Sequence, residues 1–306
     1  SPTTIARRAS FLKESMHLAE SQQMATRAVV KESAGSAYLQ WAMGAERVRL
    51  LQRLDSSYTS LAAFAVRKFE AGETGRLEKI SAQSTSDAVR VQLRQAQGDM
   101  SAYVAEVERW TGVLGNTAPD PTALASTANA PDPGGGTDPV LAQEQQRALL
   151  AEEEWKLERS QWAPALQGGA FYQTLDGASP FTGYVIGATI PIPGTGQGAR
   201  TKAARLSIEM ARQQLEDVRR TRISELFHAQ AQLAQLRESL AYYESTGASL
   251  ASTLRSDAQQ AYRAGDIGYI EFIQGIEQAH RIDTEYLRVR YELALTVLHL
   301  RALMGL

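Results

Sequence analysis

Proline is confined to the middle of this chain, apart from one residue near its start. Of the ten prolines, only Pro2 lies outside the stretch from Pro119 to Pro193. Proline removes a backbone N–H donor and clashes inside a helix, so long proline-free stretches of good helix formers favour long helices. Residues 3–118 and 194–306 are therefore predicted to be two mainly helical blocks that flank an irregular middle.

The two helical blocks carry two versions of one turn. Residues 69–80 read Phe-Glu-Ala-Gly-Glu-Thr-Gly-Arg-Leu-Glu-Lys-Ile, and residues 262–273 read Tyr-Arg-Ala-Gly-Asp-Ile-Gly-Tyr-Ile-Glu-Phe-Ile. In each version an acidic or polar pair stands between two glycines, within long sequence that is poor in glycine. This pattern is typical of a tight turn between two helices. Each block is therefore predicted to be a helical hairpin, with tips at residues 71–75 and 264–268.

The similarity of the two blocks extends well beyond the turns. Their alignment continues upstream without a gap as far as Arg7 and Arg200. We therefore expect two structural repeats, residues 1–115 and residues 140–306. Residues 116–139 between them are small, polar and rich in proline and glycine, so they are predicted to be a linker that buries no core.

The first block is expected to begin with one very long helix. Residues 5–70 are rich in good helix formers, with only Gly35 and Gly44 as weak points. Such a helix would be roughly 95 Å long, far beyond the three to four turns of an ordinary globular helix. A second helix is expected to return from the tip to Trp110, and a Gln- and Glu-rich helix is expected over residues 140–161.

The second long helix, expected over residues 199–263, carries an apolar seam. The seam residues alternate spacings of four and three, as in a coiled coil: Ala229, Leu233, Leu236, Leu240, Tyr243, Gly247, Leu250 and Leu254. After the second tip, the chain is expected to return as an apolar helix over residues 269–303.

Residues 165–192 differ from the rest of the chain. Two extended segments flank a turn at residues 176–180, which predicts one β-hairpin. Each arm is close to the roughly 9–11 residues of a transmembrane β-strand. Four aromatic residues lie near one end of the hairpin, as in the aromatic girdle of a membrane barrel: Phe171, Tyr172, Phe181 and Tyr184.

Two environments are open for this hairpin. It either packs on helices in a soluble protein or enters a membrane. A single hairpin has two open edges, and an open sheet edge cannot sit in lipid. The membrane alternative therefore requires several chains to contribute strands to one closed barrel. No apolar run approaches the roughly 20 residues of a membrane-spanning helix, so a membrane span would have to be made of strands.

Composition argues against several classes of function. The net charge is only −2 and gives no reason to expect a nucleic-acid partner. The chain has no cysteine, which excludes disulfides and thiolate metal sites. The four histidines are isolated on predicted helices, and the pair His280 and Asp283 is interpreted as a surface contact. We therefore expect no catalytic residues, no cofactor and no bound metal.

Three segments carry a resemblance to a known family. They are Glu158-Arg-Ser-Gln-Trp-Ala-Pro164 before the hairpin, Ile190-Pro-Ile-Pro-Gly194 after it, and Tyr262-Arg-Ala-Gly-Asp-Ile-Gly-Tyr-Ile-Glu-Phe-Ile-Gln274 at the second tip. Together with the duplicated helical unit, they resemble the TolC-like outer-membrane efflux channels. The amino-acid sequences of the two tips are most similar to those of the heavy-metal branch, which works with inner-membrane resistance-nodulation-division pumps.

The resemblance implies a mainly α protein whose long antiparallel helical hairpins form one protomer of an α-barrel. The strand hairpin would contribute to a transmembrane β-barrel. The assembly would be a homotrimer in the outer membrane of a Gram-negative bacterium, with its helices in the periplasm. Its partners would be a periplasmic adaptor protein, the inner-membrane pump and outer-membrane lipid. The implied function is the exit duct of a tripartite efflux system for heavy-metal cations or small toxic compounds.

The resemblance also assigns roles to residues at the tips. The adaptor is expected to dock on the turns, with the pairs between the glycines exposed: Gly72, Glu73, Thr74, Gly75, Gly265, Asp266, Ile267 and Gly268. In the resembled channels, carboxylates just past the second tip form the narrowest ring of the pore. Glu271 occupies one of these positions and Gln274 replaces another. A ring of carboxylates narrows a pore and favours cations. A plain solvated face is the other interpretation of Glu271, and its first-copy counterpart Glu78 has less reason to face inward.

The chain departs from the family pattern at its start. Residue 1 falls about where the first strand hairpin of the family would end. We therefore expect a fragment, a chain trimmed of that hairpin, or a region that lies downstream of other sequence. Three such chains would supply only half of the strands that the family's barrel uses. As written, the chain is expected not to close a trimeric barrel and to behave as a helical monomer.

Two other functions are open on the residues alone. One is a structural, scaffolding coiled-coil protein without a pore, although such a rod has no use for two aromatic-flanked strands between helices. The other is a periplasmic adaptor, which also contains a helical hairpin. Adaptors carry strand-rich domains, and no strand-rich region of that size is predicted in this sequence.

Overall fold

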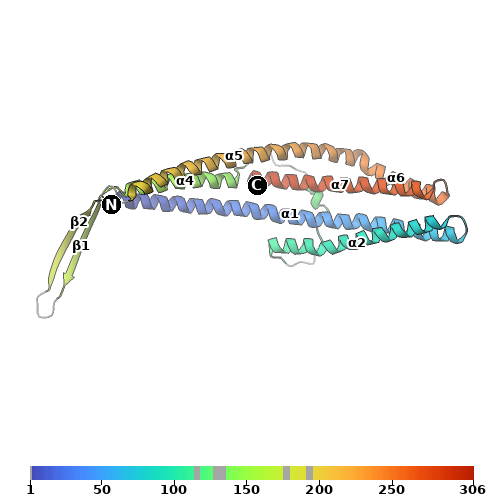
Figure 1. Cartoon of the computed structure of the whole chain (residues 1–306), viewed down its shortest axis with the longest axis horizontal. Coiled ribbons are helices and arrows are strands. Elements are labelled where there is room, and N and C mark those ends of the chain that lie inside the picture. The colour runs from blue at the N-terminus through green and yellow to red at the C-terminus, as the bar shows by residue number, and fades with distance from the viewer. Residues whose placement is uncertain (1, 114–117, 127–135, 175–179, 191–195) are drawn as a thin grey trace. The chain divides into compact units, whose positions relative to one another are not determined.

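The computed structural model describes residues 2–113, 118–126, 136–174, 180–190 and 196–306. In chain order the elements are α1 (Pro2–Glu70), α2 (Arg76–Thr111), α3 (Ala123–Ser126), α4 (Pro139–Ser160), β1 (Ala165–Gln173), β2 (Phe181–Thr189), α5 (Gln197–Tyr242), a π-helical turn (Tyr243–Gly247), α6 (Ala248–Ala264) and α7 (Tyr269–Leu303) (Figure 1). The predicted class, mainly helical with a strand hairpin, is confirmed for these residues. None of the helices in the described ranges is long and apolar enough to cross a membrane.

The chain forms two compact units, each assembled from distant parts of the sequence. The first unit contains residues 1–28, 136–225 and 305, and the second contains residues 29–135, 226–304 and 306. Helices α1 and α5 each contribute to both units. The units therefore do not coincide with the sequence repeats, and the division into two repeats and a linker stays a prediction about the sequence.

The helical part of the first unit consists of α4 with the first segments of α1 and α5. Helix α4 begins at a proline, and the carboxylate of Asp138 before it accepts a hydrogen bond from Val140 N (2.9 Å). Asp138 also forms an ion pair with Arg222 of α5 (2.9 Å). A capping carboxylate satisfies N–H groups that have no partner inside the helix. Farther along, Arg212 of α5 and Glu152 of α4 form a second ion pair (2.8 Å).

The core of the second unit is built around α7. Its residues Val289, Leu293 and Val297 are buried against Ala229 and Leu233 of α5. Nearer the tips, a second cluster joins α7 to α1, α2 and α6: Tyr58, Leu61, Val89, Tyr262, Phe272 and Ile276. The apolar return helix predicted for this part of the sequence therefore occupies the centre of the unit.

The predicted seam of the second long helix holds as far as the π-helical turn and then shifts. Beyond that turn Leu250 is 42% exposed, whereas the neighbouring Ala251 is fully buried. A π turn places one extra residue in a helical turn, which rotates every later position by about 100°. The seam prediction is therefore wrong at Leu250. Within the turn, the ring of Tyr243 stacks on Tyr286 of α7, with 5.9 Å between the ring centroids.

Part of the predicted linker packs into the core. Ala123 and Leu124 of α3 are buried against Leu39 of α1 and Ala294 of α7. The prediction that residues 116–139 bury no core is therefore wrong at α3, because two apolar residues in succession are enough to fill a groove between helices. Residues 114–117 and 127–135 lie outside the described residues.

Candidate functional site

The two helical tips close with the same backbone hydrogen bonds. At the first tip, Glu73 N donates to Lys68 O (2.8 Å), and at the second, Asp266 N donates to Ala261 O (2.9 Å). These bonds join equivalent positions of the two sequence repeats. Each satisfies a carbonyl that the helix end leaves without a partner, as in the Schellman motif. The turns predicted at residues 71–75 and 264–268 are therefore present.

The two glycines of each tip have different backbone conformations. Gly72 and Gly265 have φ of 76° and 86°, in the left-handed region that favours glycine. Gly75 and Gly268 have φ of −81° and −79° and stand in extended conformation at the starts of α2 and α7. Only the first glycine of each pair is thus required by the backbone of the turn.

A side-chain hydrogen bond joins the second tip to the first. The hydroxyl of Tyr262 on α6 donates to the carboxylate of Glu78 on α2 (2.5 Å). The other carboxylate oxygen of Glu78 accepts from the hydroxyl of Thr74 (2.5 Å). Burial, and then the bond to Glu78, raise the pKa of Tyr262 above its usual range. Sequence analysis missed this pair, because the two residues are 184 positions apart and neither repeat contains both.

The exposure of the predicted adaptor-docking residues differs from expectation. Glu73 and Asp266 are exposed, as predicted. Thr74 and Ile267 are half-buried, because Thr74 is bonded to Glu78 and Ile267 packs against the apolar cluster near the tips. The expectation that all four side chains are exposed is therefore wrong for Thr74 and Ile267.

Glu271 and Gln274, the predicted pore residues, are both exposed on α7. One carboxylate oxygen of Glu271 accepts a hydrogen bond from Gly268 N (2.9 Å) and so caps its own helix. A carboxylate has two oxygens, and the second can still interact outside the helix. The structure therefore gives Glu271 a local role, and its role in a pore stays a prediction.

The strand hairpin has two chemically different faces. Strands β1 and β2 pair antiparallel, from Ala165 opposite Thr189 to Gln173 opposite Phe181. Because paired residues point to the same side of a sheet and alternate along each strand, the register assigns every residue to a face. The face that we call the apolar face consists of Leu166, Gly168, Ala170, Tyr172, Thr182, Tyr184, Ile186 and Ala188. The glutamine face carries Gln167, Gln173 and Thr189, with three glycines, one alanine, Val185 and two phenylalanines.

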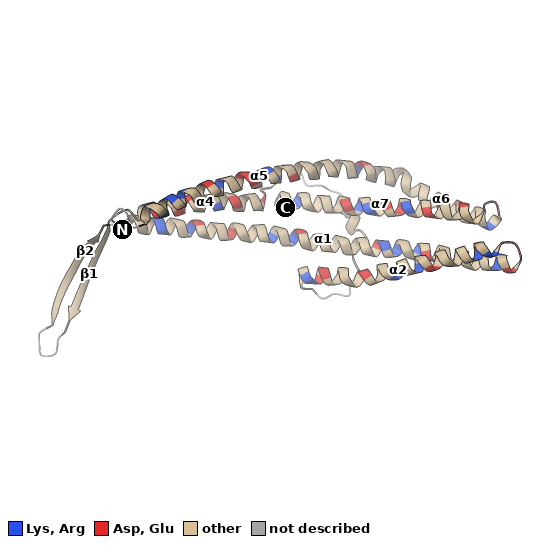
Figure 2. Ribbon diagram, in the orientation of Figure 1, with Lys and Arg blue, Asp and Glu red and all other residues tan. Residues whose placement is uncertain are grey.

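The apolar face is open to solvent. Tyr184 is 85% exposed and Ile186 is 89% exposed, and Leu166 and Tyr172 are also exposed. Neither strand contains a charged residue (Figure 2). Exposed apolar surface of this kind marks a contact with a partner or with lipid.

The four predicted aromatic residues lie in the four residue pairs next to the turn. Tyr172 and Tyr184 belong to the apolar face. Phe171 and Phe181 belong to the glutamine face, where their rings make an edge contact with 6.4 Å between centroids. Residues 175–179 of the turn and residues 191–195, which include most of the Ile190–Gly194 segment, lie outside the described residues.

Within the described ranges, no three His, Asp or Glu side chains are grouped so that they could hold a metal ion. Asp283 forms an ion pair with Arg255 of α6. Burial lowers the pKa of the neighbouring His280 below its usual value.

Several solved structures have the same fold. The CmeC outer membrane channel of Campylobacter jejuni matches with a TM-score of 0.84 and 14% identity, over 99% of this chain and 68% of CmeC. The outer membrane protein VceC of Vibrio cholerae matches with a TM-score of 0.83 and 14% identity, over 98% of this chain and 76% of VceC. CusC, described with its transmembrane channel formation, gives 0.82 and 14% over 99% of this chain and 74% of CusC. At this identity the likeness establishes a shared fold.

Sequence comparison identifies the family. A search of curated proteins finds no match. Residues 136–306, more than half of the chain, match the sequence profile described as Outer membrane efflux protein. The matched region contains the strand hairpin, the second tip and α7. From its sequence and its fold, the chain belongs to the outer membrane efflux protein family.

Proposed function

We propose that this chain is a protomer of a homotrimeric outer-membrane channel, the exit duct of a tripartite efflux system in a Gram-negative bacterium. The observation that carries the proposal is the exposed, uncharged apolar face of the β1–β2 hairpin. Membership of the outer membrane efflux protein family supports the same function.

The hairpin has the properties of a membrane strand pair. Each strand has nine residues, close to the length that crosses a bilayer when tilted. Membrane barrels place apolar side chains toward lipid and polar ones toward the lumen. The apolar face would therefore meet lipid, and the face that carries Gln167, Gln173 and Thr189 would line the lumen. Because open strand edges are not tolerated in lipid, β1 and β2 would pair at both edges with other strands of one transmembrane β-barrel.

The tips would meet the other components of the system. Glu73 and Asp266, exposed at equivalent positions of the two turns, would contact a periplasmic adaptor protein that links the channel to an inner-membrane resistance-nodulation-division pump. The hydrogen bond between Tyr262 and Glu78 joins the two helical hairpins at this point. A pore that opens by helix movement at the tips would have to break this bond.

The transported compounds would include cations. Three copies of Glu271, one from each protomer, would place three carboxylates around the pore and favour cations. With the resemblance of the tips to the heavy-metal branch, this supports heavy-metal cations or small toxic compounds as cargo. In single-channel recordings, Glu271→Gln should lower the preference for cations, and unchanged selectivity would remove Glu271 from the pore.

Molecular mass in solution tests the assembly. In light scattering coupled to size exclusion, a trimer that appears only in detergent would support the channel, because the apolar face needs lipid or detergent to cover it. A monomer with and without detergent would show that this chain alone does not assemble a membrane channel and would favour a helical rod.

A charge placed on either face of the hairpin tests the membrane contact directly. Ile186→Lys puts an ammonium on the apolar face, at a cost of about 2–4 kcal/mol near the centre of a bilayer. The matched variant Gln167→Lys puts the same charge on the glutamine face. In a liposome flotation assay, Ile186→Lys should reduce the bound fraction and Gln167→Lys should leave it near that of the wild type. Equal losses in the two variants would show that the apolar face does not meet lipid.

A further inference from the structure

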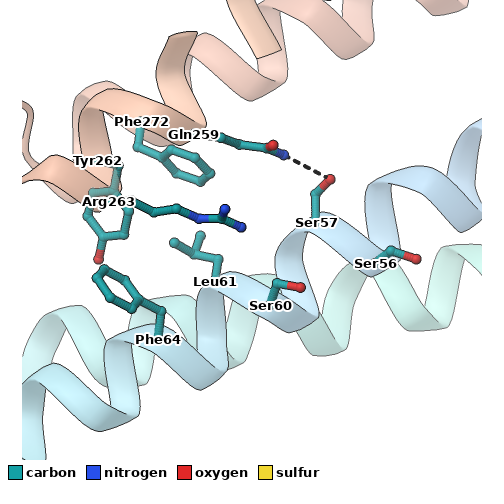
Figure 3. A pocket seen from close by; sticks show the side chains of 9 residues that line it. All are labelled: Ser56, Ser57, Ser60, Leu61, Phe64, Gln259, Tyr262, Arg263 and Phe272. Carbon is teal, nitrogen blue, oxygen red and sulfur yellow. Dashed lines mark hydrogen bonds between the residues drawn. The ribbon is translucent and has the colours of Figure 1, made fainter. Parts of the chain in front are cut away.

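A cavity of about 240 Å³ lies in the second unit between α1 and the α6–α7 hairpin (Figure 3). It is lined by Ser56, Ser57, Ser60, Leu61, Phe64, Gln259, Tyr262, Arg263 and Phe272. We propose that this cavity binds a small organic anion with a flat apolar body, such as an aromatic carboxylate. Binding of this kind goes beyond the exit-duct function and does not depend on it.

The inner walls of the cavity are apolar and well packed. Leu61, Tyr262 and Phe272 are all buried, and the rings of Phe64 and Tyr262 meet edge to face with 5.6 Å between centroids. An apolar cavity of about 150 Å³ is enough to hold benzene. The space here is therefore sufficient for one aromatic ring with a small polar group attached.

The charge of the cavity is positive. Arg263 is the one charged residue among the nine that line it. Figure 3 shows its side chain extending between Leu61 and Phe272, with the guanidinium directed toward Ser57. No ion pair found among the described residues involves Arg263. A guanidinium without a protein carboxylate is the group that best recognises a carboxylate ligand, through paired N–H donors.

The serine hydroxyls at the mouth are partly committed to their own helix. The Ser56 hydroxyl donates to Gln52 O (2.9 Å), and the Ser57 hydroxyl donates to Arg53 O (3.0 Å). A hydroxyl has one hydrogen to donate, so these two serines have no hydrogen left to offer a ligand. Ser57 already accepts a hydrogen bond from Gln259 Nε2 (3.3 Å) across the mouth.

Two other lining residues carry donors besides Arg263. The Gln259 amide has a second N–H, and Ser60 has a hydroxyl (Figure 3). Together they supply several N–H and O–H groups to one acceptor-rich group. A ligand ammonium would instead face the guanidinium without a carboxylate to compensate, so the cavity discriminates by the sign of the ligand's charge.

Binding of 4-fluorobenzoate to the full chain, followed by fluorine NMR, tests the proposal. The wild type should bind saturably, and 4-fluorobenzylamine, which has the opposite charge, should bind at least tenfold more weakly. Arg263→Gln should weaken benzoate binding at least tenfold. Arg237→Gln is the matched control, because Arg237 is also exposed and lies on α5 in the same unit, outside the cavity; it should bind like the wild type.

A second variant fills the cavity and leaves the charge in place. Ser60→Leu adds an apolar side chain to the mouth and should abolish benzoate binding while the helical circular dichroism stays unchanged. If Arg263→Gln does not fold, Ser60→Leu still tests whether benzoate binds in this cavity. Benzoate binding that survives the filling, equal binding of benzoate and benzylamine, equal losses in the two arginine variants, or no saturable binding by the wild type would each overturn the proposal.

Discussion

The return helices α2 and α7 occupy the same place in the two sequence repeats, but their surroundings differ. Helix α2 buries four residues, of which three are Ala or Ser: Ala82, Ser86, Val89 and Ala96. Helix α7 buries a long apolar stripe that includes Phe272, Ile276 and Leu293. In the aligned repeats, Lys79 stands opposite Phe272 and Gln83 stands opposite Ile276.

A helical turn and a buried core depend on different features of the sequence. Both tips keep the same closing hydrogen bonds, because such a turn depends on a glycine with positive φ and on local backbone groups. Burial of the return helix depends on the apolar side chains along it. The two copies therefore share a backbone turn, and only the second supplies the central helix of its unit.

The largest expected effect comes from truncating the core of α7. Ile276→Ala removes a fully buried side chain and should cost about 2–5 kcal/mol of unfolding free energy. The matched variant Gln83→Ala changes the equivalent, exposed position of α2 and should stay within about 0.5 kcal/mol of the wild type. Urea unfolding measures both values. Similar losses in the two variants would mean that both return helices are core elements.

The next effect concerns the hydroxyl that joins the tips. Tyr262→Phe gives the second repeat the residue type of its counterpart Phe69 and removes the hydrogen bond to Glu78. A hydrogen bond to a charged group contributes about 1.5–3 kcal/mol, and the stability should fall by that order in urea unfolding. In the Glu78→Gln background the same change should cost clearly less. Additive losses would show that the two side chains do not interact.

Substitution of the tip glycines should affect both copies alike. Gly72→Ala and Gly265→Ala each force a side chain into the left-handed region and should cost about 1–2 kcal/mol. Gly75→Ala, at an extended residue with open space around it, should cost less than half as much. Thermal unfolding followed by circular dichroism measures these shifts. A large difference in the loss of stability between Gly72→Ala and Gly265→Ala would show that the two tips are not equivalent.

Alkaline pH should destabilise the second unit. Burial raises the pKa of Tyr58 and of Tyr262 above the usual value of about 10. The folded chain then keeps phenol protons that the unfolded chain has released, so stability is complete below about pH 10 and falls as the pH rises above it. Tyr58→Phe should make urea stability less dependent on pH between 10 and 11. An unchanged slope would exclude Tyr58 as a cause.

The smallest expected effect comes from glycines inside the two return helices, and it tests how closely each helix packs against its neighbours. Gly98→Ala on α2 adds a methyl group into open space and should raise stability by about 0.5–1 kcal/mol through helix propensity. Gly275→Ala on α7 would place its Cβ 3.0 Å from the Cβ of Ala258, and this crowding should remove the gain. Differential scanning calorimetry should therefore rank Gly98→Ala as the more stable variant. The opposite order would contradict the close approach of α6 and α7.

Much of the architecture is predictable because its causes are local. The absence of proline and the choice of helix formers predict the long helices, and the glycines at positions 72 and 265 predict the tips. The strand hairpin is also predictable from the sequence, because extended residues between turn signals favour strands. In each case the residues that determine the structure lie within a few positions of one another.

Other features depend on contacts between distant residues. The π turn moves the seam from Leu250 to Ala251, and α3 is buried although its segment has the composition of a linker. The bond between Tyr262 and Glu78 likewise needs α6 to meet α2, and the cavity around Arg263 needs α1, α6 and α7 to come together. Sequence alone thus determined the helices, tips and strands, because backbone conformation follows from neighbouring residues. Tertiary structure decided which side chains are buried or paired, because packing joins residues that the sequence keeps far apart.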